Sequence, residues 1–182
     1  MSMGKCRAIT CLVGMLVSVM FAKDIRASEW FDDGPSLLCL AIGAGEILER
    51  TPQLGGAVEY RPALRFCHLG PWMSLGRGQD HEIYASLGVL LNLRLGDRWV
   101  LTPAFGGGYY ASGDGFDLGC ELEFRSAIEL SCRLTNHHRV GCVFGHLSNG
   151  GLVERNPGTE MLFLVYAIPL DGFFKKRATS LE

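Results

Sequence analysis

A short polar segment near the C-terminal end of the sequence carries the residue types that acyl transfer requires. His146 and Ser148 lie two residues apart in GHLSNGG, and Glu160 follows in NPGTE. A serine hydroxyl becomes an effective nucleophile when an imidazole takes its proton, and the imidazole needs a partner that fixes its tautomer. The three residues could therefore form a Ser–His–Glu triad. The alternative is a solvated loop, because SNGG and NPG are also common turn sequences.

Two strands joined by a turn would position these residues. In RVGCVFGHLSN, residues two apart share a face, so His146 and Ser148 point the same way as Phe144. In the strand that follows, Glu160 shares its face with a series of apolar residues. If the hairpin is symmetric about Val153, His146 lies directly opposite Glu160, with Cβ atoms roughly 4.5–5.5 Å apart. The hairpin therefore predicts a line of three polar side chains on one face.

Alternation of apolar and polar residues runs through much of the chain. Residues 118–134, LGCELEFRSAIELSCRL, are apolar at every even position except Ser126 and charged at many odd positions. A period of two over this length predicts a strand with two chemically opposite faces. Similar runs, separated by turn signals, predict eight antiparallel strands and hence an all-β barrel. The strands are expected to start near Leu37, Gly56, Pro71, Glu82, Arg98, Gly119, Arg139 and Gly158.

Alternation alone does not decide which face lines the inside of the barrel. A soluble ligand-binding barrel would point its leucines inward, whereas a transmembrane β-barrel would point them outward and enclose the charges. An N-terminal targeting segment favours the membrane barrel, and so do aromatic residues near strand ends, where the interfacial girdles of membrane barrels lie. These aromatic residues are Trp72, Tyr84, Trp99, Tyr109, Tyr110 and Tyr166.

Length and composition bound the organisation of the chain. Its 182 residues, 48% of them hydrophobic, allow one domain. Residues 1–27 are predicted to be a signal peptide, because a basic region precedes an apolar segment (9–22) too short to span a membrane. An uncleaved anchor is the alternative. The barrel is expected over residues 28–170 and a C-terminal tail over 171–182. The net charge of −2 gives no reason to expect nucleic acid as a partner.

The sequence predicts neither a metal site nor a cofactor. The five cysteines that follow residue 27 lack C-x-x-C spacing. They are expected to be small buried hydrophobic residues. A disulfide between Cys132 and Cys142 across a hairpin is the alternative.

The segment GHLSNGGLVERNPGTEMLFLVYAIPL resembles the C-terminal signature of the lipid A 3-O-deacylase family, the PagL-type outer-membrane acyl hydrolases. LRLGDRWVLTPAFGGGYY and DLGCELEFRSAIEL also resemble that family, and the likeness covers about 37–170. It implies an eight-stranded outer-membrane barrel that hydrolyses the ester-linked acyl chain at the 3-position of lipid A. It further implies that Ser148 is the nucleophile, His146 the general base and Glu160 the residue that orients the histidine. The family carries this triad on the outside of the barrel, which would turn the leucines outward.

Further expectations follow from this assignment. The oxyanion needs donors, and the candidates are Asn149, the backbone around Gly150 and Gly151, and, more weakly, Asn156. The expected partners are lipid A or lipopolysaccharide as substrate and the surrounding outer-membrane lipid, with a homodimer allowed. Three alternatives stay open: a non-catalytic structural barrel of the outer membrane, an esterase acting on another lipid, and a soluble ligand-binding barrel.

Overall fold

The computed structural model of the chain describes residues 30–48 and 51–170. The predicted signal peptide (1–27) and C-terminal tail (171–182) therefore lie outside the described residues. Within the described ranges, no helix is long and apolar enough to cross a membrane.

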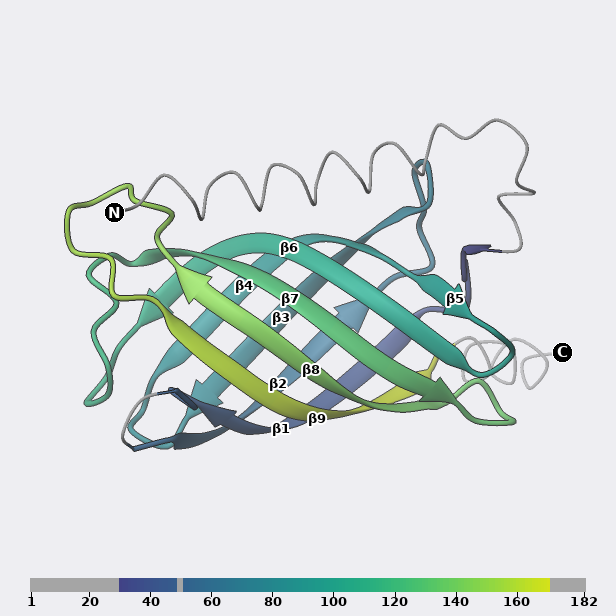
Figure 1. The fold of residues 1–182 in the computed structure, drawn as a ribbon, viewed down its shortest axis with the longest axis horizontal. Helices are drawn as coiled ribbons and strands as arrows, with labels where there is room; N and C mark the ends of the chain where they lie inside the picture. The colour runs from purple at the N-terminus through teal and green to yellow at the C-terminus, as the bar shows by residue number, and fades with distance from the viewer. Residues whose placement is uncertain (1–29, 49–50, 171–182) are drawn as a thin grey trace, which may run out of the picture.

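Within the described residues, nine β-segments form one antiparallel sheet that closes on itself (Figure 1). In chain order they are β1 (Leu37–Gly45), β2 (Gln53–Arg61), β3 (Leu69–Gly78), β4 (Ile83–Leu91), β5 (Leu93–Leu95), β6 (Trp99–Ala111), β7 (Leu122–Arg133), β8 (Arg139–Ser148) and β9 (Thr159–Pro169). Their spatial order is β4-β3-β2-β1-β9-β8-β7-β6-β5, and pairing of β4 with β6 closes the barrel.

The nine segments make eight strands around the barrel, because β4 and β5 are one strand interrupted at Asn92. Both segments pair with β6 in the same register, with Leu90 opposite Ala104 and Leu93 opposite Leu101. In this register Asn92 lies opposite Thr102, whose hydroxyl donates to the Asn92 side-chain oxygen at 2.9 Å. The next residue of β6, Pro103, has no N–H to donate to the ladder. The predicted eight-stranded antiparallel barrel is confirmed.

The two faces of the barrel differ in chemistry, as the alternation predicted. Large apolar side chains point outward, and Ile42 and Leu87 are both 70% exposed. Charged side chains such as Glu123 and Arg139 are buried inside. An apolar band of this extent is incompatible with water and suits a hydrocarbon environment. The barrel is therefore transmembrane, with its leucines facing lipid.

Ion pairs fill part of the barrel interior. Arg61 binds Glu59 at 2.7 Å and Glu129 at 2.6 Å, and Arg125 binds Glu59 at 2.6 Å. The Arg125 guanidinium also stacks over the ring of Trp72, 3.9 Å from the centroid. Because these buried charges meet opposite charges, the strands tolerate them as ionised residues on this face.

Trp72 corrects one expectation about the aromatic residues. It was expected in an interfacial girdle, but only 1% of it is exposed and its indole N–H donates to the Val89 carbonyl. Tyr84 and Tyr110 also pack inside the barrel. The other three, Trp99, Tyr109 and Tyr166, are 40–53% exposed on the outside. Position near a strand end therefore does not by itself place an aromatic residue on the outer face, since strand parity decides which face it occupies.

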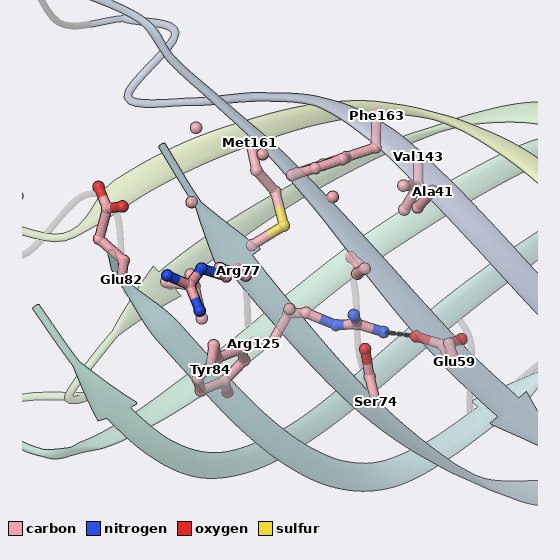
Figure 2. A pocket seen from close by; sticks show the side chains of 18 of the residues that line it. Ala41, Glu59, Ser74, Arg77, Glu82, Tyr84, Arg125, Val143, Met161 and Phe163 are labelled. Carbon is pink, nitrogen blue, oxygen red and sulfur yellow. Dashed lines mark hydrogen bonds and ion pairs between the residues drawn. The ribbon is translucent and has the colours of Figure 1, made fainter. Parts of the chain in front are cut away.

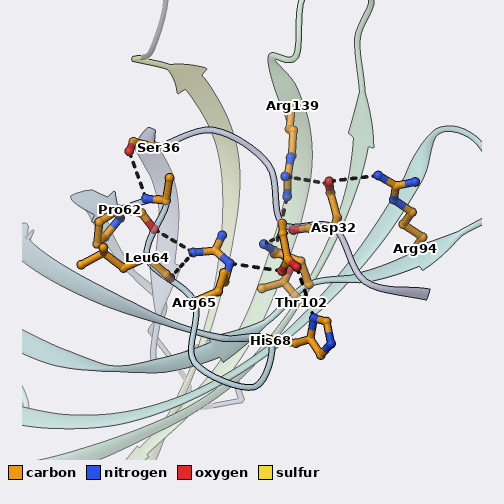
Figure 3. A network of polar contacts seen from close by, with 12 residues as sticks. Asp32, Ser36, Pro62, Leu64, Arg65, His68, Arg94, Thr102 and Arg139 are labelled. Atoms are coloured by element: carbon orange, nitrogen blue, oxygen red, sulfur yellow. Dashed lines mark hydrogen bonds and ion pairs between the residues drawn. The ribbon is translucent and has the colours of Figure 1, made fainter. Parts of the chain in front are cut away.

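The segment that precedes β1 is held by a network of polar contacts at one end of the barrel (Figure 3). Asp32 is buried and accepts hydrogen bonds from Arg133 and, at 2.8 Å, from Arg139. Its backbone N–H donates to the carbonyl of Asn92 at 3.1 Å. This end carries the start of β1 and the end of β9, so the His146 end of the β8–β9 hairpin is the opposite one.

The described cysteines are all free. Cys39 is a small buried residue as expected, whereas Cys120 and Cys132 are only partly buried and Cys67 and Cys142 are exposed. The expectation of buried cysteines is therefore wrong for Cys67 and Cys142. The alternative disulfide does not form, because the register of β7 and β8 places Cys142 opposite Leu130 and Cys132 opposite Val140.

Candidate active site

The β8–β9 hairpin brings His146 and Glu160 together. Their Cα atoms are paired in the register, as the symmetry about Val153 predicted. The His146 Nδ1 and Glu160 Oε1 atoms are 3.2 Å apart, and the two side chains are 44% and 24% exposed. If Nδ1 carries the proton and donates a hydrogen bond to the carboxylate, Nε2 keeps a free lone pair. The pair is thus arranged as a base and the group that orients it.

Ser148 is the last residue of β8 and is half-buried on the outward face. It shares this face with His146, two residues earlier. Within residues 30–48 and 51–170, no hydrogen bond joins the serine to the histidine. Catalytic hydrogen bonds often tighten only when substrate is bound. Two of the three residues are therefore in contact, and the third is adjacent.

Ser126 is a second serine beside the histidine. It lies on β7 directly opposite His146, on the side away from Glu160, and it is exposed. Cβ atoms of directly paired residues are roughly 4.5–5.5 Å apart. Sequence reasoning missed this residue as a site candidate. The available signal was its place as the one polar residue on the apolar face of residues 118–134.

Asn149 holds the loop that follows the site. Its side chain is fully buried, and its amide donates to the carbonyls of Leu118 at 3.4 Å and Arg155 at 2.9 Å. Its side-chain oxygen accepts the Gly151 N–H at 3.0 Å, and its own N–H donates to Asn156 Oδ1 at 3.1 Å. The candidate oxyanion donors of Asn149 and Gly151 are therefore already engaged within the loop. The amide nitrogen of Asn156 donates in none of these bonds.

Gly158 lies against the histidine ring. Its φ is +67°, which favours glycine. A Cβ at this position would be 2.8 Å from Cε1 and 3.2 Å from Nε2 of His146. Only the absence of a side chain lets the ring occupy this place beside the turn. This contact gives a physical reason for the glycine in NPGTE.

An ion pair connects the site loop to its neighbour. Arg155 in residues 149–158 binds Asp117 in residues 112–121. The Gly119 N–H donates to the Asp117 carboxylate at 2.8 Å. This backbone hydrogen bond, followed by Arg155, holds the pKa of Asp117 below its usual value. The two longest described loops at this end are thereby joined.

The cavity inside the barrel does not contain the site. It holds about 150 Å³ and is lined by inward-facing residues such as Glu59, Arg125 and Met161 (Figure 2). His146 belongs to the opposite, outward face of β8. In the described part of the chain, no three His, Cys, Asp or Glu side chains converge as metal ligands. Any chemistry of His146 therefore takes place on the outer surface of the barrel.

Fold and site together define a transmembrane β-barrel that presents a histidine–carboxylate pair and two serines to the surrounding lipid. The family model described as lipid A 3-O-deacylase (PagL) matches residues 53–169, and the chain belongs to this family. The outer-membrane location predicted from the sequence is confirmed by this family and by the barrel.

Individual relatives agree with this assignment. The lipid A deacylase PagL of Bordetella bronchiseptica (strain ATCC BAA-588 / NCTC 13252 / RB50) is 27% identical over 121 residues, which cover 65% of this chain. The match spans 61% of that relative's length. The crystal structure of the outer membrane enzyme PagL aligns with a TM-score of 0.57 at 19% identity, over 73% of this chain and 99% of that one. A designed transmembrane β-barrel aligns with a TM-score of 0.55 at 8% identity, over 76% and 99%. The two structural alignments support the fold.

Proposed function

We propose that the protein is a lipid A 3-O-deacylase, a serine esterase that releases the ester-linked acyl chain at the 3-position of lipid A. The observation that carries the proposal is the hydrogen-bonded His146–Glu160 pair on the lipid-facing surface, adjacent to Ser148. Family membership supports the substrate class. A site on the outside of a membrane barrel suits a substrate that is itself a membrane lipid, since the ester can reach it by lateral diffusion.

The orientation of the barrel supports an outer-leaflet substrate. Outer-membrane barrels have short periplasmic turns and longer extracellular loops. The longest described loops, 112–121 and 149–158, lie at the His146 end, whereas the connections at the other end, 62–68, 96–98 and 134–138, are shorter. We therefore assign the site to the extracellular end, where lipid A resides.

In the proposed mechanism, Ser148 Oγ attacks the ester carbonyl as His146 Nε2 takes its proton. The tetrahedral intermediate collapses to an acyl-enzyme, and the sugar oxygen leaves as a hydroxyl after His146 returns the proton. A water molecule, deprotonated by the same nitrogen, then hydrolyses the acyl-enzyme and releases the fatty acid. Glu160 stabilises the imidazolium in both halves. The Gly150 N–H and the Asn156 amide are the proposed oxyanion donors, because neither donates in the loop bonds described above.

Ser148 is preferred to Ser126 as the nucleophile for a backbone reason. Ser126 lies in the middle of β7, where β6 and β8 pair with the strand on both sides. Its neighbouring N–H groups are therefore committed to the sheet. Ser148 precedes a turn at Gly150 and Gly151, both with positive φ, where N–H groups can leave the ladder and meet an oxyanion.

The test is mass spectrometry of lipid A from cells that express the wild type, Ser148→Ala or Ser126→Ala, with each barrel shown to be folded in the outer membrane. We expect the wild type and Ser126→Ala to remove one 3-hydroxyacyl chain and Ser148→Ala to remove none. The reverse result for the two serines would reassign the nucleophile. Unchanged lipid A with the folded wild type would reject the activity, and phospholipid substrates would then separate another esterase from a structural barrel.

The allowed homodimer stays a prediction, to be checked by cross-linking in the membrane.

A further inference from the structure

The cavity inside the barrel combines charged and apolar side chains (Figure 2). Its volume is about 150 Å³. At the His146 end, the lining residues Glu46 and Gln53 are partly exposed, so the cavity is reached from that end. Deeper inside, the charged residues of the lining are Glu59, Arg61 and Arg125, and apolar ones include Val143, Met161 and Phe163.

Small inward-facing residues account for the cavity. On three neighbouring strands, Ala41 of β1 pairs with Ala57 of β2, and Ala57 pairs with Gly76 of β3. All three residues line the cavity. Protein interiors are normally close-packed. Two methyl groups and a glycine in a row therefore leave space that larger side chains would fill.

Two guanidinium groups of the lining keep N–H groups that are not used. Arg61 binds Glu59 and Glu129, and Arg125 binds Glu59. Within the described residues, Arg61 Nη1 and Arg125 Nε are buried and have no hydrogen-bond partner. A buried donor without an acceptor is costly, so these groups favour an occupant that supplies an acceptor. The occupant needs no charge of its own, because two guanidinium groups already face two carboxylates.

The cavity lies directly behind the His146–Glu160 pair. Leu147, which lines the cavity, separates His146 from Ser148 on β8. Met161, which also lines the cavity, follows Glu160 on β9. An occupant would therefore contact the inner face of the two strands whose outer face carries the pair.

We propose that the barrel interior binds a small neutral amphiphile, with one hydrogen-bond acceptor and an apolar body about the size of a benzene ring. The acceptor takes the unused N–H groups of Arg61 and Arg125, and the apolar body lies against Met161 and Phe163. An apolar protein cavity of about 150 Å³ takes up benzene, so the size fits. A charged molecule would be buried without a counter-ion. The site does not depend on the proposed esterase activity.

Methyl NMR of methionine in phospholipid nanodiscs tests the proposal. Residues 28–182 contain two methionines, and they lie on opposite faces of the barrel. Met161 lines the cavity, whereas Met73 is 54% exposed on the outer face of β3 and reports on the lipid. Met73→Leu assigns the two signals. The protein, labelled with ¹³C-methyl methionine, is titrated separately with benzyl alcohol, benzoate and benzylamine at pH 7.

We expect benzyl alcohol to shift the Met161 signal to saturation and the Met73 signal only in proportion to its concentration. The two charged probes should bind at least about tenfold more weakly, because their charge must be desolvated. Proportional changes of both signals would show uptake into the lipid alone and would overturn the proposal. An unchanged Met161 signal would do the same and would leave water as the occupant. Tighter binding of benzoate or benzylamine would overturn the assignment of a neutral occupant.

A cavity-filling variant locates the site. Ala57→Phe should abolish the saturable shift of the Met161 signal, because the ring occupies the space beside Ala41. Ala85→Phe is the matched control, since Ala85 is exposed on the outer face of β4 and does not line the cavity. It should keep the wild-type titration. Ala57→Leu repeats the test if the phenylalanine variant does not fold. Saturation that persists in a folded Ala57 variant would overturn the proposal.

Discussion

The contact between Gly158 and the His146 ring makes a sharp prediction about catalysis. In Gly158→Ala, the new methyl group would lie 2.8 Å from Cε1 and 3.2 Å from Nε2 of the histidine. Carbon atoms in ordinary contact are about 3.5–4.0 Å apart, so the ring must withdraw by about 1 Å. A displacement of about 1 Å in a catalytic group can cost about 10²-fold in rate. That loss corresponds to about 2.7 kcal/mol of transition-state stabilisation.

Gly96→Ala is the matched control for the backbone cost. Gly96 has φ of +69°, against +67° for Gly158, and nothing lies within 4 Å of its Cβ position. Both alanines should therefore destabilise the barrel by a similar amount, about 1–2 kcal/mol. Only the substitution at Gly158 should move the imidazole.

The two variants are compared by urea unfolding in lipid vesicles and by kcat/KM for lipid A deacylation. We expect similar shifts of the unfolding midpoint and about a hundredfold loss of kcat/KM in Gly158→Ala alone. Equal activity of the two variants would refute the reasoning, because the ring contact would then have no catalytic consequence. Equal loss in both would attribute the effect to the barrel rather than to the histidine.

Three further predictions concern charged groups. Glu160→Gln should lower kcat by about 10²- to 10⁴-fold with little change in KM, because the orienting carboxylate loses its charge; steady-state kinetics on lipid A checks this. Asp117 has a depressed pKa, so its contribution to loop order is present above the ordinary aspartate pKa of about 3.9 and is lost as pH falls through the depressed value. Limited proteolysis should therefore distinguish Asp117→Asn from the wild type at pH 7 and not in strong acid. Asp32→Asn should destabilise the barrel by about 3–5 kcal/mol in urea unfolding, because buried guanidinium groups lose their counter-charge. The substitution Asp33→Asn should cost much less, since that side chain is 48% exposed.

The alternation of apolar and polar residues with a period of two predicted the barrel, because successive residues of a strand point to opposite faces whatever the loops do. The hairpin symmetric about Val153 placed His146 opposite Glu160, and the register agrees. The same reasoning applied to the TNHH turn, with symmetry about Asn136, pairs Ser126 with His146. Ser126 could therefore have been found from the sequence, since a hairpin register follows from its turn.

Other features could not be predicted from parity or turn position. The burial of Asn149 depends on the carbonyls of Leu118 and Arg155, and Leu118 lies in a different loop, so only the folded chain brings these groups together. The contact of Gly158 with the histidine ring depends on a side-chain rotamer, which alternation does not specify. The sequence thus predicted which residues share a face, whereas the packing of the loops decided which hydrogen-bond donors stay free to bind an oxyanion.

The depth of the site reconciles barrel stability with the proposed chemistry. An Arg or Lys on the lipid face costs about 2–4 kcal/mol at the midplane but about 0–1 near the interface. His146 and Glu160 lie at the end of β8 and the start of β9, so their polarity falls where the cost is small. The ester linkages of a lipid lie at this same level, between head group and hydrocarbon. A His–Glu pair placed at the position of Cys142, farther from the end of β8, would destabilise the barrel. It would also contact only the methylene groups of the lipid.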